Sequence, residues 1–148
     1  MILALDTDVL VSWAMSGAVH HRASRSFLQR ELGQPGVHLG LTPQVLYEFL
    51  HIVTDGRRFA EPLSMDRARR FAASLWDAVE VERIVPGAGV AHRTLELLER
   101  LGLDRKRILD TALAATLEAA KVRRLATFNR ADFSIFSFLE VVTPMEVA

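Results

Sequence analysis

Several acidic residues in this sequence fall directly after apolar segments or at the borders of apolar helix faces, where charges are ordinarily scarce. Four of them are candidates for one shared site: Asp6, Glu48, Asp110 and Asp132. Clustered carboxylates repel one another and are costly unless a cation compensates them. Ligands that offer only oxygen suit Mg²⁺ or Mn²⁺. The chemistry that needs such a site is phosphodiester hydrolysis, because the metal positions a water, lowers the pKa of that water and stabilises the leaving oxygen.

Each acid taken alone also has an ordinary explanation. Asp6 and Asp8 are compatible with a turn or a helix N-cap after the first apolar run. Glu48 borders an apolar helix arc and is compatible with a surface pair to an arginine. Asp110 lies in the first turn of a helix, where the dipole favours a negative charge, and Asp132 is compatible with a capping residue. Only their combination, with one carboxylate at each of several strand or helix ends, indicates a shared site.

Apolar periodicity predicts an α/β domain with a largely parallel sheet of about five strands flanked by helices, joined by right-handed crossovers. The expected strands are residues 2–5, 37–41, 79–85, 124–127 and 140–142. The expected helices are residues 9–15, 20–32, 42–54, 64–78, 90–101 and 107–121. Ligands of such sheets bind beyond the carboxyl ends of the strands. We therefore expect the acids that follow strands to meet at one rim.

The composition agrees with a single domain covering residues 1–148. No cysteine is present, which excludes disulfide scaffolds and thiolate zinc sites and fits a reducing cytosol. Charges interrupt every apolar run well before membrane-spanning length, and the N-terminus lacks the basic region of a signal peptide, so a cytoplasmic protein with no membrane contact is expected. The 18 basic residues equal the 18 acidic ones, so four carboxylates neutralised by metal leave an excess of positive charge for a phosphate backbone.

Four segments occur in the order in which PIN domains carry their motifs. They are residues 2–11 (ILALDTDVLV), 42–49 (TPQVLYEF), 107–116 (RILDTALAAT) and 125–133 (LATFNRADF). The sequence resembles the PIN-domain family over its whole length, and a stand-alone chain of this size is similar to the VapC toxins of bacterial toxin–antitoxin pairs. The resemblance implies a PIN fold and an Mg²⁺- or Mn²⁺-dependent endoribonuclease acting on RNA. It also implies a homodimer and inhibition by a cognate antitoxin protein.

The resemblance carries roles over to individual residues. Asp6, Glu48 and Asp110 correspond to metal ligands, and Asp132 completes that site. Thr127 and Asn129, in the fourth motif, correspond to residues that support the site by hydrogen bonding.

Asp8 departs from the family pattern, which more often has asparagine at this place. Three consequences stay open at this point. The first is that Asp8 supports the metal ligands without binding the metal itself. The second is that it raises the pKa of a neighbouring acid, and the third is that it points away from the site.

Two other functions remain as alternatives. Asp6-Thr7-Asp8 after an apolar strand also resembles the acid pair of haloacid-dehalogenase-type phosphatases, although these need a lysine near the site and only Lys106 and Lys121 exist here. The second alternative is a PIN-like interaction module without catalysis. Failure to bind Mn²⁺ at millimolar concentration would favour the module, and hydrolysis of a small phosphomonoester would favour the phosphatase.

A group of arginines follows the helix that carries Glu48. Its members are Arg57, Arg58, Arg67, Arg69 and Arg70. Such a group is ordinarily a solvated face. As a hypothesis, these side chains contact the phosphates of an RNA substrate, which makes binding depend on salt.

Overall fold

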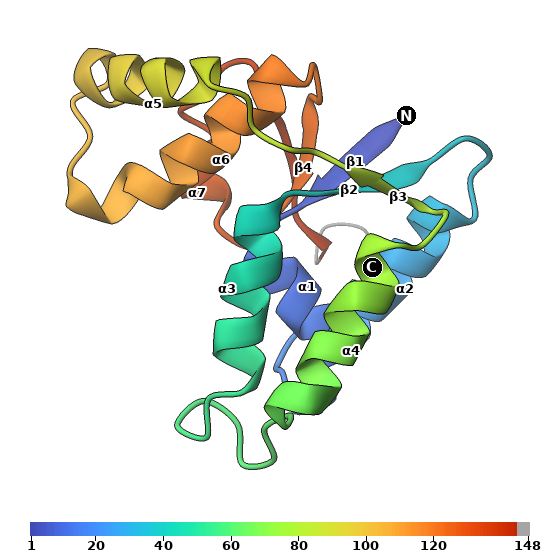
Figure 1. Ribbon diagram of the computed structural model, residues 1–148. Helices are drawn as coiled ribbons and strands as arrows, with labels where there is room; N and C mark the ends of the chain where they lie inside the picture. Colours follow the sequence, from blue (N-terminus) through green and yellow to red (C-terminus); the bar gives the residue numbers. More distant parts are fainter. Residues whose placement is uncertain (145–148) are drawn as a thin grey trace.

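Five parallel strands form one sheet in the computed structural model, which describes residues 1–144 (Figure 1). The strand order is β3-β2-β1-β4-β5. The strands are β1 (Ile2–Leu5), β2 (His38–Leu41), β3 (Val81–Arg83), β4 (Arg124–Ala126) and β5 (Glu140–Val142). The expected α/β class and the parallel sheet of five strands are thus confirmed. Strand β3 is shorter than the expected residues 79–85, because only its central residues pair with β2, at Leu39–Leu41.

Helices cover both faces of the sheet. They are α1 (Thr7–Ala14), α2 (His21–Leu32), α3 (Pro43–Val53), α4 (Met65–Trp76), α5 (Gly89–Arg100), α6 (Ile108–Ala119) and the short α7 (Arg130–Phe133), with a 3₁₀ turn η1 (Arg105–Arg107) before α6. Figure 1 shows α1–α4 gathered on one side of the sheet and α5–α6 on the other. Strand β1 lies at the centre of the sheet, and the chain adds β2 and β3 on one side of it and β4 and β5 on the other. Right-handed crossovers in these two opposite directions place the two groups of helices on opposite faces of the sheet.

Local capping explains where several helices begin. Helix α3 starts at Pro43 because the hydroxyl of Thr42 accepts a hydrogen bond from the Val45 N–H at 3.2 Å. Helix α1 starts two residues earlier than expected, at Thr7, because the Asp6 carboxylate accepts from the Thr7 N–H. Helix α7 was not expected from the sequence, since a single turn leaves no recognisable apolar period.

The core lies on both sides of β1 and β2. Leu3, Leu5, Phe49 and Leu113 are almost completely buried there. Gly40 in β2 allows this packing, since a Cβ at this position would stand 2.7 Å from Ile84 and 2.8 Å from Ile2 side-chain atoms. In the described part of the chain, no helix is long and apolar enough to span a membrane.

Candidate active site

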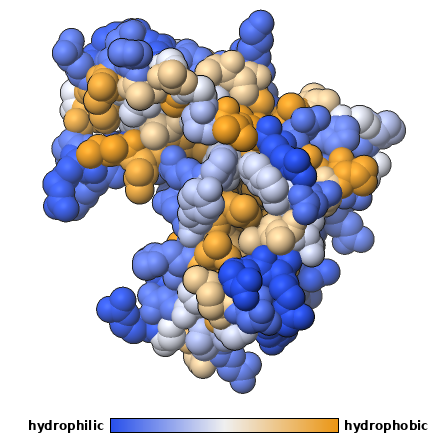
Figure 2. All heavy atoms as spheres, viewed as in Figure 1, coloured by the Kyte–Doolittle hydropathy of each residue, from blue (hydrophilic) through white to orange (hydrophobic). Residues whose placement is uncertain are grey.

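An open pocket of about 490 Å³ lies beyond the carboxyl ends of β1 and β4, where the chain order of the sheet changes direction. Four carboxylates line it, those of Asp6, Asp8, Glu48 and Asp110. In Figure 2 the surface is hollowed between the part formed by α5 and α6 and the part formed by α3 and α4. Three of the four expected metal ligands therefore share one pocket, although they come from a strand end and two different helices.

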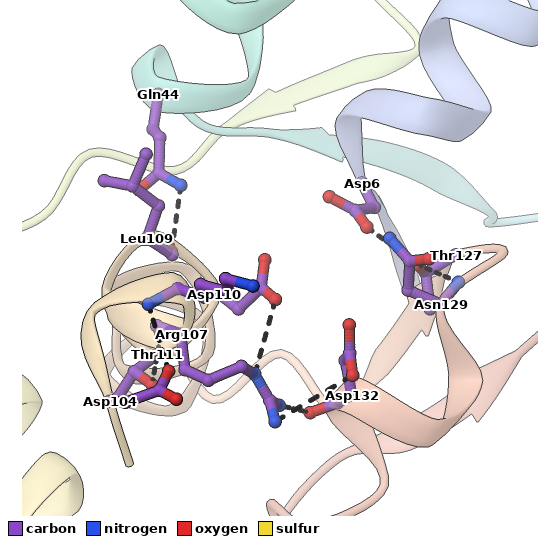
Figure 3. A network of polar contacts seen from close by, with 11 residues as sticks. Asp6, Gln44, Asp104, Arg107, Leu109, Asp110, Thr111, Thr127, Asn129 and Asp132 are labelled. Atoms are coloured by element: carbon purple, nitrogen blue, oxygen red, sulfur yellow. Dashed lines mark hydrogen bonds and ion pairs between the residues drawn. The ribbon is translucent and has the colours of Figure 1, made fainter.

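Asp6 is held in place by the ends of β1 and β4. It is 8% exposed, and its Oδ1 accepts a hydrogen bond of 2.8 Å from the Thr7 N–H. Its Oδ2 accepts a hydrogen bond of 2.6 Å from the hydroxyl of Thr127, which directly follows β4 (Figure 3). The Thr127 hydroxyl in turn accepts from the Asn129 N–H at 3.0 Å. Thr127 thus supports the site through its side chain, whereas Asn129 contributes its backbone and also lines the pocket.

Asp8 also lines the pocket, so it does not point away from the site. One carboxylate oxygen, Oδ2, accepts a hydrogen bond of 3.1 Å from the Phe128 N–H. The other oxygen, Oδ1, is buried and has no hydrogen-bond partner among the described residues. A buried carboxylate oxygen without a donor is costly, and a cation is one way to satisfy it.

Glu48 is placed by two polar neighbours. Its Oε1 accepts from the Thr7 hydroxyl at 3.1 Å and from the Gln44 side-chain amide at 3.4 Å. The same amide of Gln44 donates to the Leu109 carbonyl at 3.0 Å, as Figure 3 shows. Gln44 therefore links α3 to the first turn of α6, which carries Asp110.

Asp110 and Asp132 are joined through one arginine. Arg107 approaches an oxygen of each carboxylate at 3.8 Å and donates a hydrogen bond to the backbone carbonyl of Asp132. Figure 3 shows Asp6, Asp110 and Asp132 around the same open space. Asp132 does not line the pocket itself, and its side chain is 48% exposed. It lies at the rim, whereas the other expected ligands lie inside.

Burial and mutual repulsion raise the pKa values of the acids. The pKa of Asp6 rises to about 7, first because of burial and then because of the charge of Asp8, while the Thr127 and Thr7 hydrogen bonds oppose the rise. Burial raises the pKa of Asp8 to about 6, and the hydrogen bond from the Phe128 N–H opposes the rise. Burial also raises the pKa of Asp110, which the charge of Arg107 partly offsets. The pocket therefore holds more negative charge than its surroundings compensate.

Two contributing residues were not identified from the sequence. Gln44 stands one helical turn before Glu48, and Arg107 stands three residues before Asp110, so both spacings place the side chains on a shared helix face. That spacing is the signal that could have identified them. Their further contacts, to Leu109 and to Asp132, depend on the tertiary fold.

The chain belongs to the PIN domain family, whose model matches residues 3–139. No curated protein matches the chain. The resemblance to PIN domains that the four motifs indicated is therefore confirmed.

Solved structures with similar folds include VapC toxins and their complexes. VapC20 of Mycobacterium tuberculosis, a sarcin–ricin loop cleaving toxin, is 21% identical with a TM-score of 0.70, over 95% of this chain and 98% of that one. VapBC-1 of nontypeable Haemophilus influenzae is 15% identical with a TM-score of 0.69, over 98% and 99% of the two chains. VapBC2 of Rickettsia felis, bound to a DNA fragment from its promoter, is 19% identical with a TM-score of 0.67, over 97% and 98%. At these identities the similarity establishes a shared VapC-like PIN fold.

Proposed function

We propose that this protein is a divalent-metal-dependent endoribonuclease that hydrolyses RNA phosphodiester bonds with Mg²⁺ or Mn²⁺, and that it is the toxin of a toxin–antitoxin pair. The observation that carries the proposal is the gathering of Asp6, Asp8, Glu48 and Asp110 in one open pocket at the switch point of the sheet. Membership of the PIN family supports a nuclease, and hydrolysis by metal is the chemistry that such a set of oxygens serves.

The donor set fits a hard divalent cation. All the candidate ligands offer carboxylate oxygen, and one buried oxygen of Asp8 has no donor among the described residues. No three His, Cys, Asp or Glu side chains within residues 1–144 are close enough together to enclose a metal ion. Mg²⁺ does not need such a cage, because it keeps several waters and takes one or two carboxylates together with substrate phosphate. Acids that repel one another also spread apart without a cation between them.

In this proposal Asp6, Glu48 and Asp110 hold the metal, and Asp132 completes the site from the rim. Bound there, the metal supplies an activated water and stabilises the charge that develops on the leaving oxygen. Thr127 orients Asp6 by donating to Oδ2, and this hydrogen bond favours the ionised form of the carboxylate against the effect of burial.

Thr7 and Gln44 orient Glu48 in the same way. Gln44 also bonds the Leu109 carbonyl, next to Asp110, and so keeps the Glu48 and Asp110 helices at a constant separation.

The partners in this proposal are an RNA substrate, a second copy of the chain and an antitoxin protein, all in the cytoplasm. The VapBC and other toxin–antitoxin complexes with a similar fold support an antitoxin partner. Exposed apolar side chains next to the pocket offer surface for a homodimer: Tyr47 is 65% exposed and Leu109 is 56% exposed. Sedimentation of the purified chain tests the dimer directly.

The deciding experiment compares wild type, Asp110→Asn and Glu99→Gln on a mixed RNA pool in Mg²⁺, in Mn²⁺ and in EDTA. Glu99 is an exposed acid on α5 that does not line the pocket, so its variant controls for the loss of one negative charge. We expect discrete cleavage that requires metal, persists in Glu99→Gln and drops at least a hundredfold in Asp110→Asn. Cleavage that survives EDTA, or that Asp110→Asn retains, would contradict the proposal.

The same proteins separate the two alternatives. Neither lysine of the chain lines the pocket, so a phosphatase that balances a phosphoaspartate with lysine has no support here. Hydrolysis of a small phosphomonoester that Asp6→Asn abolishes would revive it. A folded wild type that neither cleaves RNA nor binds millimolar Mn²⁺ would leave the non-catalytic interaction module.

A further inference from the structure

The arginines that follow α3 fall into two groups in the structure. Arg57 pairs with Asp55 at 3.4 Å, and both Arg69 and Arg70 pair with Asp66, at 2.9 and 2.8 Å. The fold therefore already provides these three with a carboxylate partner. Arg58 and Arg67, by contrast, form no ion pair within the described range 1–144, although the charge of Arg58 also lowers the pKa of Asp55. Both side chains are exposed, so an anionic partner can reach their guanidinium groups.

Arg58 lies where the acidic pocket meets a neighbouring one. The lining of the acidic pocket includes Arg58 and Phe59, and both residues also line a second pocket of about 610 Å³. The second pocket continues along the turn after α1, at Met15 and Gly17, and reaches Arg67. We call this hollow, with its shared wall at Arg58 and Phe59, the Arg67 pocket. The two pockets thus lie on either side of Arg58 and Phe59, and the first of them holds the carboxylates.

The charge changes from negative at the carboxylates to positive at Arg58 and Arg67. This order suits a polyanion that is bound next to a metal ion. The acidic pocket repels phosphate until a cation occupies it, so attraction must come from its rim. Arg107 already faces Asp110 and Asp132, whereas Arg58 is the basic residue in the pocket lining, and its planar guanidinium matches two oxygens of a phosphate. Arg67 adds a second positive charge to the Arg67 pocket, opposed by the exposed acid Glu61. Phe59 beside Arg58 packs against the core and is partly exposed.

We propose, building on the nuclease function proposed above, that one strand of the RNA runs from the acidic pocket over Arg58 and Phe59 into the Arg67 pocket, with Arg58 binding a backbone phosphate. The substrate is single-stranded along this path. Unstacked bases of single strands pack on aromatic side chains while the backbone follows basic groups, whereas a duplex keeps its bases inside. Arg57 directly precedes Arg58 but pairs with Asp55, and it takes no part in this path.

The test measures the binding of a short fluorescent uridine-rich RNA by anisotropy, in an Asp110→Asn background that does not cleave it. Arg58→Gln removes the proposed phosphate contact, while Arg57→Gln and Arg69→Gln remove arginines of the paired group. Releasing one phosphate contact to a single strand lowers the slope of log K against log salt by about 0.7, which corresponds to about a fivefold loss of affinity at roughly 0.1 M salt. We expect this loss only in Arg58→Gln, with unchanged Tm because the side chain is exposed.

Two comparisons complete the test. A duplex of the same sequence should bind at least about tenfold more weakly than the single strand, since it cannot stack bases on Phe59. In cleavage assays on the otherwise wild-type chain, Arg58→Gln should raise KM about fivefold and leave kcat within about twofold. The reason is that the contact is to a phosphate beside the reacting one, so it binds the substrate and the transition state equally.

The path is wrong if Arg58→Gln binds RNA with the affinity and salt slope of Arg57→Gln, if the duplex binds as tightly as the single strand, or if no RNA binds at all. A different result is also informative: Arg58→Gln loses affinity for RNA, but the wild-type chain never cleaves RNA. That result supports the path and contradicts the nuclease function. The two proposals therefore fail on different measurements.

Discussion

Replacing Asp8 by asparagine should stabilise the metal-free protein above about pH 6 and weaken its binding of Mg²⁺ or Mn²⁺. Asparagine keeps a carbonyl oxygen that can accept from the Phe128 N–H, as Asp8 Oδ2 does at 3.1 Å. It also removes a negative charge that raises the pKa of Asp6. The carboxylate oxygen that has no donor among residues 1–144 becomes a neutral amide. The variant thus removes repulsion while it preserves the packing.

The size of the effect follows from the pKa values. The pKa of Asp8 is about 6 in the folded protein and 3.8 when unperturbed, and each pH unit of difference is worth about 1.4 kcal/mol. A raised carboxyl pKa means that the folded state binds more protons than the unfolded state, so stability is lost as the pH rises from about 4 to about 6 and stays reduced above that. Allowing for partial exposure, we expect Asp8→Asn to recover about 1–3 kcal/mol at pH 8, or roughly 2–9 °C in Tm.

The assay is thermal unfolding of wild type and Asp8→Asn in EDTA from pH 4 to pH 8, repeated in saturating Mg²⁺. Wild type should lose stability across this range in EDTA and regain it with Mg²⁺, since ligand bound at a hundred times its Kd stabilises by about 2.7 kcal/mol. Asp8→Asn should show a flatter pH profile and a smaller gain from Mg²⁺. A parallel pH profile for the two proteins in EDTA, or an equal Mg²⁺ gain, would refute the view that Asp8 adds uncompensated charge to the site.

Three further predictions concern single contacts. Thr127→Val removes the 2.6 Å hydrogen bond to Asp6 and should lower the free energy of unfolding in urea at pH 8 by about 1.5–3 kcal/mol. The control Thr94→Val loses only a hydrogen bond within its own helix and should lower it by less. Equal losses would argue against a special role for Thr127. Gly40→Ala should cost about 1–3 kcal/mol by the same measurement, because its Cβ meets Ile84 and Ile2; an unchanged midpoint would contradict the close packing. Arg107→Gln should lower Tm in EDTA by more than in Mg²⁺, because the metal replaces the lost positive charge near Asp110 and Asp132; an equal drop in both would contradict this.

Much of the secondary structure follows from local sequence. The limits of β1 and β5 match the expected residues, since an apolar run bounded by polar residues is a property of adjacent positions. The start of α3 likewise follows from Thr42-Pro43, where cap and proline act within one turn. The alternation of these elements predicted the parallel sheet and the rim at which ligands bind.

The arrangement of the site depended on contacts between distant segments. Thr127 reaches Asp6 across 121 positions in the sequence, and Gln44 reaches the Leu109 carbonyl across 65. Spacing along the chain gives no information about such pairs, because they form only after the fold places β4 beside β1 and brings the first turn of α6 within reach of Gln44 on α3. The same holds for Asp8, whose side chain lines the pocket and accepts a hydrogen bond from the Phe128 N–H across 120 positions of the sequence.

The sequence by itself determined which residue types were present for metal chemistry and at which strand and helix ends they occur. The tertiary structure alone decided that Asp8 joins the pocket and that Asp132 stays at its rim beside Arg107. The physical reason is that periodicity and capping act over a few residues, whereas burial, repulsion and pairing of charges act through space between segments that only the folded chain brings together.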